Sequence, residues 1–352
     1  MKKRVLSVVL TLCLFAGIVS LAGCGSSSKV TLNVYNWGEY IDMSVLPEFE
    51  KETGIKVNYT TYANNEEMYA KIASGAASYD VIVPSDYMIS KLIKEDMLAK
   101  LDFQNIPNAK YIGEDFKGLQ FDPNNEYTVP YTWGTTVIIY NKTMVAPEDV
   151  AAKSIDLLWN KRYAGQILMF DNPRDAFGLA LTKLGYSLNT ESPAEWEAAA
   201  QELKMQKPLV QAYVMDQIFD KMESGEAAIA PYYAGDAIII QDGNPDVDYY
   251  IPQEGANFFV DAMCVLKNSP HKAEAEAFIN FMCRTDVAVK TAEIIGYATP
   301  HTEAVKQLDP RITQNPVVYP DEQTLANTEV FLNLNKEISR LQSDLWTDIK
   351  KD

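Results

Sequence analysis

The sequence predicts an α/β protein with two lobes. Its 352 residues are too many for one typical core and suit two lobes. Hydrophobic residues make up 47% of the chain and charged residues 22%, which is an ordinary globular composition. Strand patterns and helix patterns alternate along the first part of the chain, with connections long enough for parallel pairing.

The first helices and strands are indicated by the regular spacing of their apolar residues and by glycines that end helices. Gly54 and Gly75 are typical helix stops, and Asn65 is a candidate helix cap. The run "YDVIVP" is continuously apolar and suits a buried parallel strand. We therefore expect a strand at 30–36, a helix at 43–53, a strand at 55–62, a helix at 65–75, a strand at 79–84 and a helix at 88–98.

A long β-rich stretch at 127–141 is expected to carry the chain from one lobe into the other. Trp133 within it is assigned to this crossover. Beyond it we expect helices at 154–165, 175–186, 193–206, 216–226, 271–284 and 286–296, strands at 166–171, 227–233 and 258–266, and a largely helical tail from Asp321.

The N-terminus has the pattern of a secretory signal. "MKKR" is a positive start, an apolar run follows, and "LAGC" closes it with small residues before Cys24. This ending resembles the bacterial lipobox, which implies that residues 1–23 are removed and that Cys24 is lipidated. Residues 24–29 then form a flexible tether. A membrane-spanning helix is the less favoured alternative, because the run is short.

Removal of residues 1–23 leaves 28 Lys and Arg against 48 Asp and Glu, a net charge of −20. Such a surface repels nucleic acid and attracts cations.

Cys264 and Cys283 lie in apolar runs, so we expect two buried free thiols, with a disulfide as the alternative. His271 and His301 are the two histidines of the sequence, which leaves little material for a catalytic triad or an ordinary zinc site.

Ligands of open α/β sheets bind beyond the carboxyl ends of the strands. The segments just after predicted strands are rich in aromatic and acidic residues and hold a single basic residue, Arg174. Neither GxGxxG nor a P-loop motif occurs in the sequence. This composition suits a cationic, partly apolar ligand such as a polyamine, with carboxylates for the ammonium groups and aromatic faces for the methylenes. The segments are 37–40, 85–87, 171–175 and 232–236.

Six motifs recur in order along nearly all of the mature chain: "YNWGEY", "TGIKVNYTTYANNEEMYAKI", "YDVIVPSDY", "FDPNNEYTVPYTWGTT", "IGYATP" and "VYPDEQT". They resemble the spermidine/putrescine-binding proteins of bacterial polyamine ABC transporters. The resemblance implies the type II periplasmic-binding-protein fold, in which two α/β lobes, each a mixed sheet flanked by helices, close on ligand held between them. It places lobe 1 at 30–136 and 260–305, and lobe 2 at 137–259 and 306–352.

The resemblance also implies a set of ligand-binding residues. Four positions depart from the family: Asn172 replaces an acid, Tyr233 and Phe259 replace tryptophans, and Phe331 replaces a glutamine. Asp261 stands in an otherwise apolar strand, where a carboxylate needs a partner. Asp175 and Ser85 could instead cap helices, and Asp236 is expected to do so. The implied set is Trp37, Glu39, Tyr40, Ser85, Tyr87, Asn172, Asp175, Tyr233, Phe259, Asp261, Tyr297 and Phe331.

The sequence thus predicts a monomeric, lipid-anchored receptor on the extracytoplasmic face of the membrane, on the periplasmic side if there is an outer membrane. It would deliver spermidine or putrescine to an ABC permease and its cytoplasmic ATPase, without a cofactor, a bound metal or enzymatic activity. Three anions, Glu39, Asp175 and Asp261, slightly favour spermidine. The alternatives are a receptor of the same fold for ferric iron or another organic cation, a sensor component that binds the same ligand, and, less favoured, an exported hydrolase.

Overall fold

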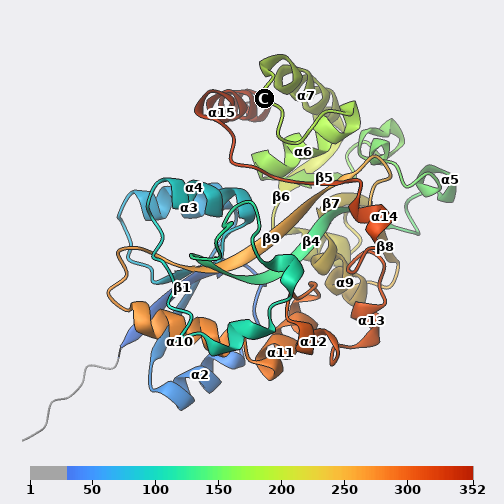
Figure 1. Cartoon of the computed structure of the whole chain (residues 1–352). Helices are drawn as coiled ribbons and strands as arrows, with labels where there is room; N and C mark the ends of the chain where they lie inside the picture. The colour runs from blue at the N-terminus through green and yellow to red at the C-terminus, as the bar shows by residue number, and fades with distance from the viewer. Residues whose placement is uncertain (1–29, 352) are drawn as a thin grey trace, which may run out of the picture. The chain divides into compact units, whose positions relative to one another are not determined.

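The computed structural model describes residues 30–351, and the chain from Thr31 onward forms one compact unit (Figure 1). The predicted signal, the lipidation site Cys24 and the tether lie outside the described residues. No helix within 30–351 combines the length and the apolar character needed to cross a membrane.

The first part alternates strand and helix as predicted. β1 is parallel to both β2 and β3, with Val34 opposite Tyr59 on one side and Val81 on the other. Parallel neighbours require crossover connections, and helices provide them here. The elements are β1 (Thr31–Trp37), α2 (Val45–Thr53), β2 (Lys56–Tyr62), α3 (Asn65–Ala73), β3 (Val81–Ile82) and α4 (Asp86–Lys94).

The remaining predicted elements occur in the predicted order except at 154–165, and further strands and helices are added between them. They are β4 (Thr128–Asn141), α5 (Pro147–Val150), β5 (Ile167–Phe170), α6 (Pro173–Leu184), α7 (Pro193–Gln206), β6 (Val210–Val214), α8 (Ile218–Glu223), β7 (Ile229–Tyr233), α9 (Ala234–Gly243), β8 (Val247–Tyr250), β9 (Ala256–Val265), α10 (Lys272–Met282), α11 (Thr285–Ile295), α12 (Thr302–Val305), α13 (Pro310–Thr313), α14 (Glu322–Leu325), β10 (Thr328–Val330) and α15 (Lys336–Lys350).

The strands form one mixed sheet in the order β2-β1-β3-β9-β4-β7-β5-β6, with β8 paired to β4 and β10 to β9. β4 connects its two parts, because it pairs antiparallel with β9 up to Thr135 and with β7 from Thr136 onward. In Figure 1, α2 and α10 lie near β1, whereas α6, α7 and α15 lie around β5. The division into lobes at 136/137, 259/260 and 305/306 stays a prediction.

Aromatic and aliphatic side chains of α2, α10 and the strands beside them form one buried core. Phe49 of α2 packs edge-on against Phe278 and Phe281 of α10, with ring centroids 5.3 and 5.4 Å apart.

Cys264 and Cys283 are both buried free thiols, as expected. Desolvation therefore raises the pKa of both thiols.

Two local predictions are corrected. The cap of α3 is Asn64, whose side chain accepts from the amide of Glu67, so Asn65 is the first helical residue. Residues 154–165 form two short 3-10 turns instead of a helix. The tail after Asp321 is largely helical, as predicted, with the short strand β10 between α14 and α15. Asparagine at both 64 and 65 left the position of the cap open by one residue.

Candidate ligand-binding site

A pocket of about 650 Å³, counting space open to solvent, lies where several strands end. β1, β3, β5 and β7 each deliver lining residues just beyond their carboxyl ends, and β9 crosses the pocket with lining residues of its own. Eleven of the twelve sequence-predicted residues line it: Trp37, Tyr40, Ser85, Tyr87, Asn172, Asp175, Tyr233, Phe259, Asp261, Tyr297 and Phe331.

Glu39 is the predicted residue that the structure does not bring into the pocket lining. It is exposed, and its backbone has a φ of +46°, in the left-handed region. Its neighbours Trp37, Gly38 and Tyr40 do line the pocket. Burial raises the pKa of the pocket residue Asp216, and the nearby charge of Glu39 adds to this effect. Its role as a ligand-binding anion therefore stays a prediction.

Aromatic side chains form the walls of the pocket. Tyr233 and Phe259 meet edge to face with centroids 5.5 Å apart, and Tyr40 meets Tyr297 in the same way at 4.9 Å. The indole nitrogen of Trp37 donates to the carbonyl of Val83 at 2.8 Å, which fixes the position of its ring. Such rings offer both flat apolar surface and attraction for a cation.

Asp261 of β9 is a buried carboxylate, with 3% of its surface exposed. Its Oδ2 accepts a hydrogen bond of 2.6 Å from the phenol of Tyr40, while its Oδ1 has no hydrogen-bond partner among the described residues. Burial raises the pKa of this carboxyl to about 6, although Ser85 and Tyr40 stabilise its charged form. A buried carboxylate oxygen without a partner is ready to accept a donor from a ligand.

Asp175 is the third residue of α6, and it does not cap that helix. The cap is Asn172, whose side chain accepts from the amide of Arg174 at 2.9 Å. Oδ2 of Asp175 instead accepts from the phenol of Tyr233 at 2.9 Å. Burial raises the pKa of Asp175 to about 7, and the charge of Glu66 adds to this effect.

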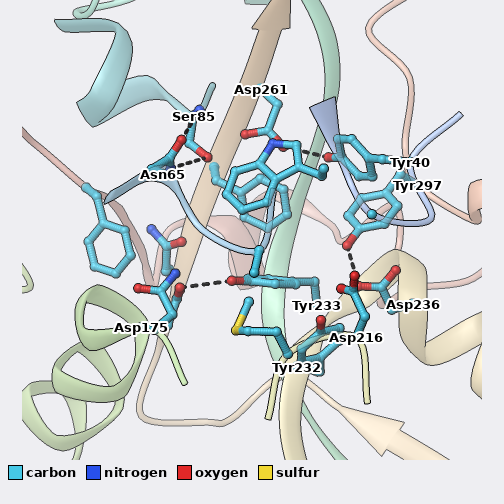
Figure 2. Close-up of a pocket in the computed structure, with 18 of the residues that line it drawn as sticks. Tyr40, Asn65, Ser85, Asp175, Asp216, Tyr232, Tyr233, Asp236, Asp261 and Tyr297 are labelled. Atoms are coloured by element: carbon cyan, nitrogen blue, oxygen red, sulfur yellow. Dashed lines mark hydrogen bonds between the residues drawn. The ribbon is translucent and has the colours of Figure 1, made fainter. Parts of the chain in front are cut away.

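Ser85 occupies the cap position of α4 but makes no capping hydrogen bond. Its hydroxyl accepts instead from the side-chain amide of Asn65 at 3.1 Å, which holds it in the pocket lining (Figure 2). Asn65 is free for this contact because Asn64 caps α3.

The structure adds three aspartates that the implied set lacked, Asp86, Asp216 and Asp236. Asp236 was expected to cap α9, but the cap position belongs to Tyr233, and Asp236 accepts from the phenol of Tyr297 at 2.7 Å. Asp86 and Asp236 lie in the segments just after predicted strands, and this position could have indicated them as pocket residues. Asp216 follows β6, a strand that the sequence did not predict.

The charged side chains of the pocket lining are all acidic. Five aspartates line it, and the lining residues include no Lys, Arg or His. In Figure 2, Asp175 lies on the left of the pocket and Asp216 with Asp236 on the right, while Asp261 lies above them at the top of the view. Residues 30–351 hold no group of three or more His, Cys, Asp or Glu suited to a metal ion. The arrangement can pair several positive charges spaced along an apolar chain.

The model of the bacterial extracellular solute-binding protein family matches residues 45–319. The chain belongs to this family. This solute-binding protein is 39% identical over 319 residues to the spermidine/putrescine-binding periplasmic protein of Escherichia coli K12, covering 90% of this chain and 91% of that one. The resemblance predicted from the sequence is thus confirmed.

The solved structures similar to this solute-binding protein include two of polyamine ABC transporters. One, assigned to a spermidine/putrescine ABC transporter of Listeria monocytogenes, has a TM-score of 0.87 and 41% identity, with 91% of this chain and 99% of that chain covered. The other is the spermidine/putrescine ABC transporter substrate-binding protein of Streptococcus pneumoniae, with a TM-score of 0.76, 38% identity and coverage of 92% and 99%. The fold is therefore the predicted type II periplasmic-binding-protein fold.

Proposed function

We propose that this solute-binding protein is a polyamine receptor that binds spermidine or putrescine and delivers it to an ABC permease. The observation that carries the proposal is the unpartnered Oδ1 of the buried Asp261, in a pocket lined by five aspartates and by aromatic rings. Relatives and neighbours that carry spermidine or putrescine in their names support the same ligand class.

The physical argument concerns desolvation. An ammonium group that leaves water needs a carboxylate or other acceptors, since an unpaired buried charge is costly. Asp261 and Asp175 offer two such partners at separate places, and Tyr233 and Phe259 offer faces for the methylenes between them. Each contact between an ammonium and a ring contributes about 0.5–2 kcal/mol. We propose that the ligand is bound by these residues together with the other lining residues of the predicted set.

Ligand delivery would follow from closure of the pocket. Binding would draw the two lobes together by a hinge motion, and the permease, powered by a cytoplasmic ATPase, would recognise the closed form. We further propose that the protein acts as a monomer and is held at the extracytoplasmic face of the membrane by a lipid on Cys24. It would perform no chemistry on its ligand.

Isothermal titration calorimetry with putrescine, spermidine and spermine tests the proposal, with butylamine as a monoamine control. We expect saturable binding of at least one polyamine and much weaker binding of butylamine, which can engage one carboxylate at a time. If none of the three polyamines gives binding heat or a thermal shift at millimolar concentration, the proposal is wrong. A visible charge-transfer band on titration with ferric iron would favour an iron receptor instead.

A further inference from the structure

Four tyrosines of the pocket lining share one arrangement of their hydroxyl groups. Each phenol donates a hydrogen bond to a carboxylate, at 2.6 to 2.9 Å. Because an ionised carboxylate has no proton to donate, the phenol is the donor in each pair and its oxygen remains an acceptor. An ammonium group carries three donors and no acceptor, so such oxygens suit it. The pairs are Tyr40 with Asp261, Tyr87 with Glu66, Tyr233 with Asp175 and Tyr297 with Asp236.

Glu66 differs from the other three carboxylates because it is not among the residues that line the pocket. It is the second residue of α3, and Tyr87 is the second residue of α4. Oε1 of Glu66 accepts from the phenol of Tyr87 at 2.9 Å, and Tyr87 lines the pocket. The carboxylate of Glu66 is therefore connected to the pocket through the hydroxyl of Tyr87.

The second carboxylate oxygen of Glu66 makes this residue costly as a purely structural contact. Oε2 is buried and has no hydrogen-bond partner among residues 30–351. A buried carboxylate oxygen without a donor is unfavourable. Burial raises the pKa of Glu66, although the hydrogen bond from Tyr87 and the charge of Arg174 oppose this rise. A further cation bound nearby would offset the cost.

Arg174 of α6 does not supply the missing partner of Glu66. Its guanidinium donates to the carbonyl of Leu188, to the side chain of Asn189 and to the carbonyl of Leu332. None of these bonds reaches Glu66. The positive charge of Arg174 is thus engaged with neutral acceptors, and the charge of Glu66 is left for another cation.

The hydroxyl of Tyr87 also lies within the influence of Asp175, which lines the pocket. Burial raises the pKa of Tyr87, and the charges of Glu66 and Asp175 both add to the rise. Asp175 itself accepts from the phenol of Tyr233 at 2.9 Å. Two carboxylates therefore act on the Tyr87 phenol, Asp175 from within the pocket lining and Glu66 from outside it.

We propose that Glu66 is a positioning residue for the ligand: it accepts the hydrogen bond of the Tyr87 phenol and so leaves the phenol oxygen to accept from an ammonium group of the bound polyamine. The inference rests on the proposed polyamine function. A phenol that donates to a carboxylate is a stronger acceptor, because hydrogen bonds in a chain polarise one another. Glu66 thereby strengthens cation binding through Tyr87, without touching the cation.

A double-mutant cycle of Glu66→Gln and Tyr87→Phe tests the route through the phenol. Calorimetry with spermidine and putrescine at pH 8 measures the affinity of the wild type, the two single variants and the double variant. We expect Glu66→Gln to weaken binding by about three- to tenfold when Tyr87 is present, because the charged acceptor of its hydroxyl is lost. In the Tyr87→Phe background the same change should alter affinity by less than about twofold.

Glu67→Gln is the matched control for the change of charge. Glu67 follows Glu66 on α3 and is exposed. Its side chain accepts from the amide of Ala63 at 3.2 Å, and glutamine can make the same contact. We expect this variant to bind both amines as the wild type does.

Wild-type affinity in Glu66→Gln, with any loss confined to Tm, would show that Glu66 only links α3 to α4, and would overturn the proposal. An equal loss with and without the Tyr87 hydroxyl would also overturn it, because the charge would then act on the ligand directly. Glu66→Ala places a good helix former at the same position and keeps the cycle available should Glu66→Gln fail to fold.

The same titrations separate this inference from the proposed function. If the wild type binds no polyamine, the proposed function is wrong and the role of Glu66 falls with it. If the wild type binds a polyamine and Glu66→Gln shows no coupling to Tyr87→Phe, the function stands and the role of Glu66 alone is wrong.

Discussion

The phenol of Tyr40 donates a hydrogen bond of 2.6 Å to Oδ2 of Asp261, and so ties the loop after β1 to the middle of β9. The same phenol lies 2.5 Å from the hydroxyl of Thr132 on β4. Three segments far apart in the sequence thus fix one carboxylate. With Oδ2 held in this way, Oδ1 is left without a partner among the described residues.

Asp261→Asn is expected to weaken polyamine binding by more than about 2 kcal/mol, because a desolvated ammonium loses its charged partner. Calorimetry with putrescine and spermidine measures the loss. Asn fits the same space and can still accept from Tyr40, so the variant should fold. Asp344→Asn on the exposed face of α15 is the matched control and should bind as the wild type does. Unchanged affinity in Asp261→Asn would show that the site is misplaced.

Ligand affinity is expected to fall as the pH is lowered from about 8 to about 5, because only the ionised carboxyls pair with an ammonium. The pKa of Asp175 is raised from 3.8 to about 7, and that of Asp261 from 3.8 to about 6. A raised carboxyl pKa means that the ligand-free folded state binds more protons than the unfolded state. These two groups therefore make the ligand-free protein more stable as the pH falls through this window.

The ligand-induced rise in Tm should for the same reason shrink on acidification. Thermal unfolding with and without spermidine across this range measures it. In Asp175→Asn the dependence on pH near 7 should flatten, since the group that titrates there is gone. A constant ligand-induced shift between the two pH extremes would contradict a role for either carboxyl in binding the cation.

The longer helices and strands could be predicted from the sequence because their apolar residues recur at a regular spacing. Val45, Leu46 and Phe49 form the buried face of α2, and Gly54 ends it with a φ of +74°. β6, β8 and β10 could not be predicted, because they are short and mostly half-buried, so no clean alternation marks them. Their pairing is decided by the strands beside them, which are distant in the sequence.

The strand-end rule and the family resemblance together indicated most of the pocket lining. What they could not give is the direction of individual side chains. Asp236 enters the pocket lining because Tyr297, which is 61 residues away, holds its carboxyl. Glu39 stays outside the lining, with its backbone in a left-handed turn. Both outcomes depend on tertiary contacts and backbone geometry that a strand-end position does not encode.

Asn172→Asp is expected to strengthen spermidine binding relative to putrescine, because it adds an anion beside Asp175 at one side of the pocket. Aspartate can cap α6 as asparagine does, so the helix should stay intact. Competition calorimetry of the two amines in the wild type and the variant gives the ratio of affinities. An unchanged ratio would mean that position 172 does not set the length of the ligand.

Gly235→Ala is expected to weaken polyamine binding by displacing Tyr297. A Cβ at position 235 would lie 2.1 Å from Cδ2 of the Tyr297 ring, so the ring must move. That movement would break the 2.7 Å hydrogen bond from Tyr297 to Asp236 and disturb the wall that Tyr297 forms with Tyr40. Calorimetry measures the loss of affinity, and near-ultraviolet circular dichroism reports the changed tyrosine environment.

Gly185→Ala at the end of α6 is the control for stability alone. Gly185 has a φ of +71° with no other atom within 4 Å of an added Cβ, so alanine there should cost about 1–2 kcal/mol of stability through backbone strain. It should leave polyamine affinity unchanged, because the position is outside the pocket lining. Wild-type affinity in Gly235→Ala, with Tm lowered as in Gly185→Ala, would show that the Tyr297 ring and its bond to Asp236 contribute to the fold but not to ligand binding.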